Sequence, residues 1–188
     1  MSGSGPEAGA ERSPLRVRGR AWVFGDEINT DDMYPGFAMK LSVPEAARYM
    51  FDATRPGWPE LVRPGDIVVA GKNFGLGSSR PCAELFTHLG VSCLLAEQYN
   101  SLFHRNALNY GLPALTVPDA RTLITEGDVL EIDAVTGLVR NETRGTEHRI
   151  EPLPEFVVEL IAGGGLINRL EAGGFLDRND ATSSAGER

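Results

Sequence analysis

The chain has 188 residues, of which 41% are hydrophobic, and it carries a formal net charge of -8. This length and apolar content are enough to bury the core of one domain. The negative charge and the lack of a basic run argue against nucleic-acid binding, which depends on clustered Lys and Arg. No segment approaches the roughly 18 to 20 apolar residues that cross a bilayer, and the N-terminal residues lack a signal-peptide pattern, so we expect a cytoplasmic protein without membrane segments.

The two ends of the chain differ in composition from its middle. Residues 1–15 and 177–188 are rich in Ser, Gly and charged residues and contain few bulky apolar groups. Such segments cannot bury enough apolar surface to fold, so we expect disordered tails around a single domain over residues 16–176.

In the first third of the chain, the pattern predicts a short strand, an acidic turn and a short helix. The strand is Ala21–Phe24, the acidic turn covers 25–32 and leads into a loop through Tyr34-Pro35-Gly36, and the helix is Ser42–Ala53. A Pro-rich connector around Trp58 follows.

The middle of the chain alternates between apolar runs and helices. Strands are predicted at Ile67–Ala70, Val91–Ala96 and Leu112–Val117, with helices from Pro81 to Gly90 and from Ser101 to Tyr110. This strand-helix-strand-helix-strand order is typical of parallel strands in an α/β fold.

From Asp128 the pattern changes to the strict alternation of a small antiparallel meander, with a turn at Thr136-Gly137. A closing helix is predicted over Pro154–Ala162, ending in the glycine run 163–165.

The two cysteines, Cys82 and Cys93, lie inside apolar segments. Reduced thiols in such places pack as small hydrophobic groups. We therefore expect neither a disulfide framework nor a metal cluster built from this chain alone.

A glycine-rich turn between the predicted strand Ile67–Ala70 and the following helix is the strongest candidate for chemistry. It runs from Gly71 to Pro81 and presents Ser78, Ser79 and Arg80. The N–H groups and dipole of a helix start can stabilise a substrate carboxylate or a serine oxyanion. The segment alone is equally compatible with a serine that only caps the helix. Arg80 either binds a carboxylate through two N–H groups or lies on the surface.

The acidic turn is a second candidate, because Asp26, Glu27, Asp31 and Asp32 fall within seven positions. Such a density can hold a cation, orient a base or form Asx turns, and turn formation is the commonest case. It lacks the spacing of a calcium loop. The three histidines have no paired metal-ligand spacing.

Four blocks together resemble the small subunits of 3-isopropylmalate dehydratases, in the aconitase superfamily, and they span roughly Arg20 to Leu170. They are Gly25-Asp26-x-Ile28-x-Thr30-Asp31, Gly71-Lys72-Asn73-Phe74-Gly75-x-Gly77-Ser78-Ser79-Arg80, Phe103-x-x-Asn106-x-x-Asn109-x-Gly111-Leu112-Pro113 and Gly164-Gly165-Leu166-Ile167-Asn168. The resemblance implies the family's swivelling domain, an α/β fold of β/β/α layers.

The resemblance also implies roles for the candidate residues. Ser78 would be the base that removes the proton alpha to a carboxylate, with Ser79 and Arg80 holding the oxyanion and a substrate carboxylate. Asp31, in the acidic turn, would support this site. A separate large subunit, paired as a heterodimer or heterotetramer, would carry a [4Fe-4S] cluster on three cysteines and activate the leaving hydroxyl as a Lewis acid, while this chain would bind no cofactor.

The implied reaction is reversible dehydration of a small hydroxy dicarboxylic acid. The first expectation is isomerisation of 2-isopropylmalate to 3-isopropylmalate in leucine biosynthesis, and the alternative is a homoaconitate or 2-alkylmalate type of hydratase. Segment 37–40 falls at the family's substrate-recognition loop, where Met39 suits an alkyl group and Lys40 a third carboxylate. Leu76 and Pro81-Cys82 depart from the common family pattern, which affects selectivity more than chemistry.

Two functions of other classes compete with this interpretation. A stand-alone anion- or nucleotide-binding module fits a glycine-rich loop before a helix, although the Arg80-Pro81 ending differs from a Walker loop. An RNA-binding regulatory role, known for some aconitase relatives, is disfavoured by the acidic charge.

Overall fold

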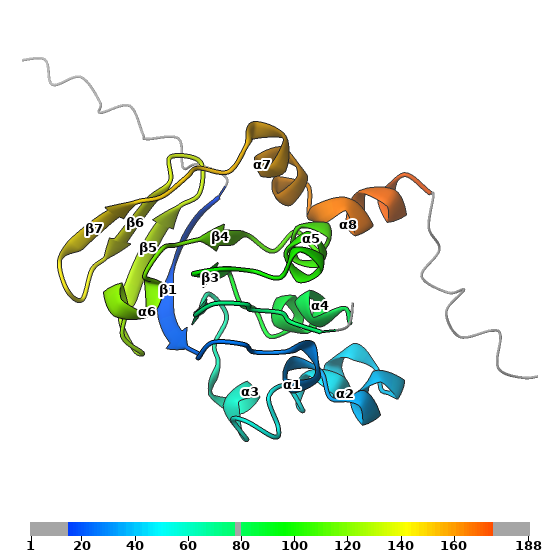
Figure 1. Ribbon diagram of the computed structural model, residues 1–188. Helices are drawn as coiled ribbons and strands as arrows, with labels where there is room; N and C mark the ends of the chain where they lie inside the picture. The colour runs from blue at the N-terminus through cyan, green and yellow to red at the C-terminus, as the bar shows by residue number, and fades with distance from the viewer. Residues whose placement is uncertain (1–14, 78–79, 175–188) are drawn as a thin grey trace, which may run out of the picture.

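The computed structural model describes residues 15–77 and 80–174, whose strands form one mixed seven-stranded sheet (Figure 1). The strand order is β4-β3-β2-β1-β5-β6-β7. The strands are β1 (Arg16–Val23), β2 (Ile67–Ala70), β3 (Cys93–Ala96), β4 (Ala114–Thr116), β5 (Val129–Asp133), β6 (Leu138–Asn141) and β7 (Thr146–Arg149).

Strand β1 joins a parallel half of the sheet to an antiparallel half. Its first residues, Arg16–Arg20, pair antiparallel with β5, and Ala21–Val23 pair in parallel with β2. The sheet curls at this strand, so that apolar side chains of β5 and β6 share one buried cluster with side chains of β2, β3 and β4. The inward residues are Ile67, Val69, Cys93, Leu95, Leu115, Leu130, Ile132 and Val139.

Helices cover the other face of the parallel strands. Because side chains alternate along a strand, Val68, Leu94 and Ala114 point away from the first cluster and into a second one, which contains Leu85 and Phe103. The helices with buried residues in this second cluster are α1 (Thr30–Met33), 3₁₀ helix η1 (Gly36–Lys40), α2 (Val43–Ala47), α3 (Trp58–Leu61), α4 (Cys82–His88) and α5 (Ser101–Asn109). Helices α6 (Ala120–Leu123) and α7 (Glu155–Ala162) bury residues in the first cluster, and α8 (Gly165–Ala172) contacts α5 and α7. The result is the predicted β/β/α layering.

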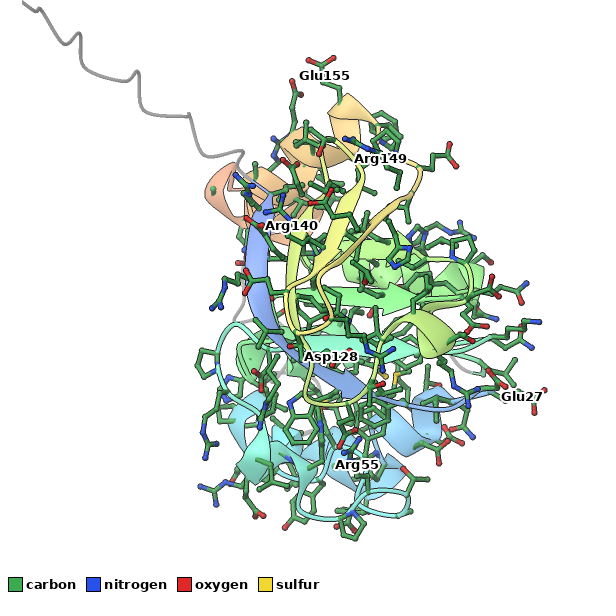
Figure 2. The ribbon with its side chains drawn as sticks, turned by 90° about the vertical axis from the view of Figure 1, so that its left-hand side faces the viewer. Glu27, Arg55, Asp128, Arg140, Arg149 and Glu155 are labelled. Carbon is green, nitrogen blue, oxygen red and sulfur yellow. The ribbon has the colours of Figure 1, made fainter. Side chains whose placement is uncertain are left out.

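The predicted α/β core is confirmed as β2-α4-β3-α5-β4, with parallel pairing throughout. The predicted meander is confirmed as β5-β6-β7. Figure 2 labels Arg140 on this meander, where its guanidinium contacts Glu131 and Glu147. Glu147 lies on β7, an edge strand of the sheet, where charged side chains disfavour pairing with other chains.

Several boundaries differ from the prediction, and the first strand begins at Arg16 rather than at Ala21. The helix expected over 42–53 ends at Ala47 and continues as turns, and it could not extend through Phe51, which has a left-handed φ of 58°. The glycine run 163–165 does not end the fold but turns the chain from α7 into α8, with Gly164 and Gly165 at positive φ. Pro81 is the N-cap of α4 rather than its first residue.

Leu15, placed in the N-terminal tail by composition, is instead buried, and its carbonyl accepts a hydrogen bond from the Ala134 N–H. The other tail residues, 1–14 and 177–188, lie outside the described residues. Within 15–77 and 80–174, no helix has both the length and the apolar character that a bilayer span requires.

Candidate active site beyond the parallel strands

Two loops that leave the carboxyl ends of β1 and β2 lie against each other and are joined by backbone hydrogen bonds. The Glu27 N–H donates to the Lys72 carbonyl at 2.8 Å, the Gly75 N–H donates to the Ile28 carbonyl at 2.9 Å, and the Thr30 N–H donates to the Leu76 carbonyl at 2.8 Å. Carboxyl ends of parallel strands are a common place for binding sites. The acidic turn and the glycine-rich turn therefore form one unit.

Glycine is required at two points of this unit where the backbone has a positive φ. A Cβ on Gly75 would lie 2.2 Å from Cβ and Cγ of Phe103, and the residue has a φ of +84°. Gly77 has a φ of +108°, and its Cβ would lie 3.3 Å from Oγ1 of Thr30. Both positions combine a backbone conformation that L side chains avoid with close packing.

Helix α1 orients the acidic turn through a capping box. The Asn29 side chain accepts a hydrogen bond from the Asp32 N–H at 2.8 Å, and the Asp32 carboxylate accepts one from the Asn29 N–H at 3.2 Å. Asp32 is therefore used in capping, whereas Asp31 projects from the first turn. The spacing Asn29-x-x-Asp32 is itself a capping signal, and it marks a short helix where only a turn was expected.

Arg80 and Asp31 are brought together, as the family resemblance led us to expect. Nη2 of Arg80 lies 2.7 Å from Oδ1 of Asp31, and Nη1 donates to the Tyr34 carbonyl at 2.6 Å. Arg80 is held from two sides and its side chain is 19% exposed, while that of Asp31 is 66% exposed. An ion pair this exposed contributes only about 0.2–1 kcal/mol to stability, so its main effect is to orient the guanidinium.

Part of the Arg80 guanidinium remains available for a ligand. A guanidinium has five N–H donors, and Asp31 and Tyr34 engage one on each terminal nitrogen. Its other donors have no partner within 15–77 and 80–174. Ser78 and Ser79, the predicted base and oxyanion holder, lie outside the described residues.

The expectation that the α4 N-terminus offers free N–H groups to an anion is wrong for its first turn. The Cys82 N–H donates to the Arg80 carbonyl at 2.8 Å, the Ala83 N–H to Oδ1 of Asn106 at 3.2 Å and the Glu84 N–H to the Pro81 carbonyl at 3.1 Å. The Asn106 side chain thus bonds to the backbone of α4.

Met39 and Lys40 lie in η1, which begins beside Arg80. A Cβ on Gly36, the first residue of η1, would lie 3.8 Å from Nη2 of Arg80. Met39 is 48% exposed, Lys40 is exposed, and Phe37 packs edge-on against Tyr49 with ring centroids 5.1 Å apart. Residues 37–40 therefore border the site and expose the apolar side chains of Phe37 and Met39.

Neither cysteine fits an iron–sulfur site. Both are buried. Cys82 lies in the second cluster, between the sheet and the helices, and Cys93 lies in the first cluster, which the two halves of the sheet share. Burial raises the pKa of the Cys82 thiol to about 12, and burial also raises the pKa of Cys93, so both stay protonated rather than becoming thiolate ligands. No group of three or more His, Cys, Asp or Glu side chains within 15–77 and 80–174 could hold a metal ion.

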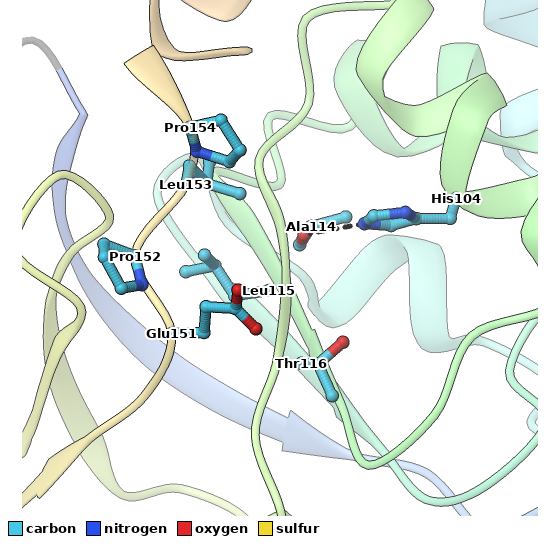
Figure 3. Close-up of a pocket in the computed structure, with 8 residues that line it drawn as sticks. All are labelled: His104, Ala114, Leu115, Thr116, Glu151, Pro152, Leu153 and Pro154. Carbon is cyan, nitrogen blue, oxygen red and sulfur yellow. Dashed lines mark hydrogen bonds between the residues drawn. The ribbon is translucent and has the colours of Figure 1, made fainter.

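A cavity of about 170 Å³ lies elsewhere, between β4 and the segment that leads into α7 (Figure 3). The His104 ring on its border contacts the Ala114 carbonyl through Nε2 at 3.0 Å and stacks on Tyr99. The ring is thus used in packing, and the cavity shares no lining residue with the Arg80–Asp31 site.

Comparisons with known proteins agree with this architecture. Residues 54–120 match the family model described as the aconitase C-terminal domain. The chain is 45% identical over 153 residues to the 3-isopropylmalate dehydratase small subunit of Methanosarcina mazei, covering 80% of this chain and 94% of that protein. It is 40% identical over 154 residues to the methanogen homoaconitase small subunit of Methanothermobacter thermautotrophicus, covering 81% and 89%.

A solved structure gives the same result for the fold. The crystal structure of 3-isopropylmalate dehydratase from Methanocaldococcus jannaschii has a TM-score of 0.78 and 30% identity, and the match covers 85% of this chain and 96% of that chain.

Proposed function

We propose, from the finding that this chain belongs to the 3-isopropylmalate dehydratase small-subunit family of the aconitase superfamily, that it acts with a large subunit to isomerise 2-isopropylmalate to 3-isopropylmalate. The observation that carries the proposal is the 2.7 Å contact between Arg80 and Asp31. This contact joins the acidic turn to the glycine-rich turn, and the family resemblance assigns both turns to the site.

In this proposal, Arg80 binds a carboxylate of the substrate. Asp31 and the Tyr34 carbonyl fix the guanidinium, and the donors left over can form a bidentate pair with a carboxylate. Prior orientation lowers the entropic cost of binding and fixes the carbon next to that carboxylate.

The proton on that carbon is then taken by the Ser78 alkoxide, and Ser79 supports the developing negative charge. The C–H electron pair forms the double bond as the neighbouring hydroxyl leaves with the C–O electron pair and takes up a proton to become water, and water then adds back with the opposite placement of proton and hydroxyl. A [4Fe-4S] cluster on the large subunit would supply the Lewis acid for the leaving hydroxyl. This chain contributes the base, the carboxylate site and part of the substrate-recognition surface.

The substrate side chain is proposed to lie near η1. The exposed side chains of Phe37 and Met39 suit the isopropyl group, since an alkyl substituent gains by leaving water. Lys40 is the residue of this segment that suits a further carboxylate, which is the chemistry of a homoaconitate-type substrate. The name of the Methanothermobacter relative keeps this alternative open.

The test is anaerobic reconstitution of the full chain with its large subunit. The proposal predicts conversion of 2-isopropylmalate, no conversion by the chain alone, and slower conversion of homoaconitate. Preference for homoaconitate would favour the alternative substrate, and no activity on either acid would refute the proposal.

A single substitution then tests the base. Ser78→Ala in the reconstituted enzyme should lower kcat by about a thousandfold or more without preventing subunit assembly. Ser101→Ala, at an exposed position of α5, is the matched control and should change kcat little. Near-normal turnover of Ser78→Ala would remove Ser78 as the base.

An anion- or nucleotide-binding module is the other candidate function. The first three N–H groups of α4 are already bonded within the chain, which weakens it. Calorimetric titration of ATP into the full chain should give no saturable binding, and micromolar affinity would favour the module.

A further inference from the structure

Asn106, on α5, reaches across to the start of α4. Its Oδ1 accepts the Ala83 N–H at 3.2 Å. Ala83 is fully buried, and it stands three residues after Arg80 in the chain. The contact therefore ties the base of the Arg80 segment to a different helix.

The start of α4 needs an acceptor from outside itself. The first N–H groups of a helix have no partner within it and are usually satisfied by a Ser, Thr, Asp or Asn at the N-cap. The N-cap here is Pro81, which has no side-chain acceptor. Asn106 supplies the missing acceptor for a buried N–H that would otherwise be costly to leave unbonded.

The same face of α5 holds the other end of the segment. Phe103 is three positions before Asn106, so the two side chains lie on one side of the helix. The Phe103 ring packs edge-on against Phe74 with centroids 5.2 Å apart, and its Cβ and Cγ lie where a Cβ on Gly75 would be. One helix thus fixes the chain at Gly75 and again at Ala83.

On the far side, the segment is joined to the helix that carries Asp31. The Cys82 thiol contacts the Thr30 carbonyl at 3.7 Å, and the Thr30 N–H bonds the Leu76 carbonyl. The start of α4 is therefore held between α5 and the helix that carries Asp31, and loss of the contact to α5 would change how Arg80 meets Asp31.

We propose that Asn106 is a positioning residue that sets the placement of the Arg80 guanidinium through its hydrogen bond to the Ala83 N–H. The consequence for substrate binding rests on the proposed function, whereas the placement of Arg80 does not. Asn106→Leu removes the acceptor at nearly constant size, and Asn106→Asp keeps an acceptor whose charge suits a helix start. Arg105→Ala, on the exposed side of α5, is the control for changes in the helix itself.

The first readout needs no activity. In the full ¹⁵N-labelled chain, Asn106→Leu should speed amide exchange at Ala83 by about fivefold or more and shift the Arg80 Nε–H resonance. Asn106→Asp and Arg105→Ala should leave both near the wild-type values. Unchanged Ala83 exchange or an unmoved Arg80 signal in Asn106→Leu would overturn the proposal, whether or not the assembled enzyme is active.

The second readout uses the assembled enzyme. Asn106→Leu should raise KM for the hydroxy dicarboxylic acid about tenfold with a smaller change in kcat, and Asn106→Asp should restore KM. In an enzyme that already carries Arg80→Lys, adding Asn106→Leu should raise KM by less than about twofold, because the effects of residues that act together are not additive. Equal effects in both backgrounds would mean that Asn106 acts on stability alone. Inactive wild-type enzyme would count against the proposed function, and the resonance result would still decide the role of Asn106.

Discussion

The antiparallel and parallel halves of the sheet organise their charges in different ways. In the antiparallel half, Arg140 stands directly opposite Glu131 on one neighbouring strand and Glu147 on the other, and it forms ion pairs with both. Cross-strand partners of this kind follow from sheet register. In the parallel half, Arg80 meets Asp31 only because two loops far apart in sequence are joined by backbone hydrogen bonds. The ion pairs of Arg140 should therefore tolerate the loss of one charge, whereas the contact between Arg80 and Asp31 depends on a few backbone positions.

The largest effect on stability is expected at the loop junction. Gly75→Ala should lower the free energy of unfolding by about 2–4 kcal/mol, from about 1 kcal/mol for the left-handed φ and about 1–3 kcal/mol for overlap with Phe103. Urea unfolding of the full chain measures this loss. Gly145→Ala in the meander is the matched control, because Gly145 also has a positive φ of +67° but nothing within 4 Å of its Cβ. It should cost about 1 kcal/mol, and equal losses at both positions would contradict the packing argument.

Asp128 is the exception in the antiparallel half, because it is a buried charge. Burial alone would raise its pKa, but hydrogen bonds from the Thr125 N–H and Asn141 and the charge of Arg144 outweigh burial, so the pKa of Asp128 is lowered. A carboxyl whose folded pKa is below its unfolded value of about 3.9 stabilises the fold above that value and loses this contribution as pH falls through the folded pKa.

Asp128→Asn should therefore cost about 1–3 kcal/mol at pH 7. The difference from the wild type should shrink as the pH falls below about 4. Urea unfolding at several pH values measures this dependence, and a loss that stayed constant down to pH 2 would contradict the assignment.

The smallest effect is expected for the exposed ion pairs of the meander. Arg140→Ala should destabilise the fold less than either substitution above despite two contacts, and the effect should fall at high salt because exposed charges are screened. Thermal unfolding at low and at 1 M salt tests this, and a loss comparable to that of Gly75→Ala would reverse the comparison between the two halves.

The sequence predicted the elements whose signals are local. Alternation from Val129 to Ile132 indicated the meander, and the apolar runs at Ile67–Ala70 and Val91–Ala96 indicated buried parallel strands. The sequence could not indicate that β1 pairs with both halves, since this pairing depends on which distant strands meet. Helix α8 was missed because consecutive glycines are read as an ending, although they also permit a tight turn between helices.

The same distinction holds at the candidate site. Arg80 and Asp31 were expected together through resemblance to a family, and no local pattern in the residues required their contact. The Tyr34 carbonyl that holds Arg80 and the Asn106 side chain that caps α4 are contacts between elements far apart in sequence. Spacing could identify Asn106 as a polar residue in an apolar helix, but it could not identify the N–H to which it bonds.

The most direct test of the carboxylate site is the KM of the reconstituted enzyme for 2-isopropylmalate when Arg80 is replaced by Lys. Lysine keeps the charge, but its ammonium group cannot bind a carboxylate through two parallel N–H groups while it also contacts Asp31 and Tyr34. We predict a rise in KM of about a hundredfold with unchanged affinity between the subunits. An unchanged KM in a fully assembled enzyme would contradict the assignment of Arg80 to the substrate carboxylate.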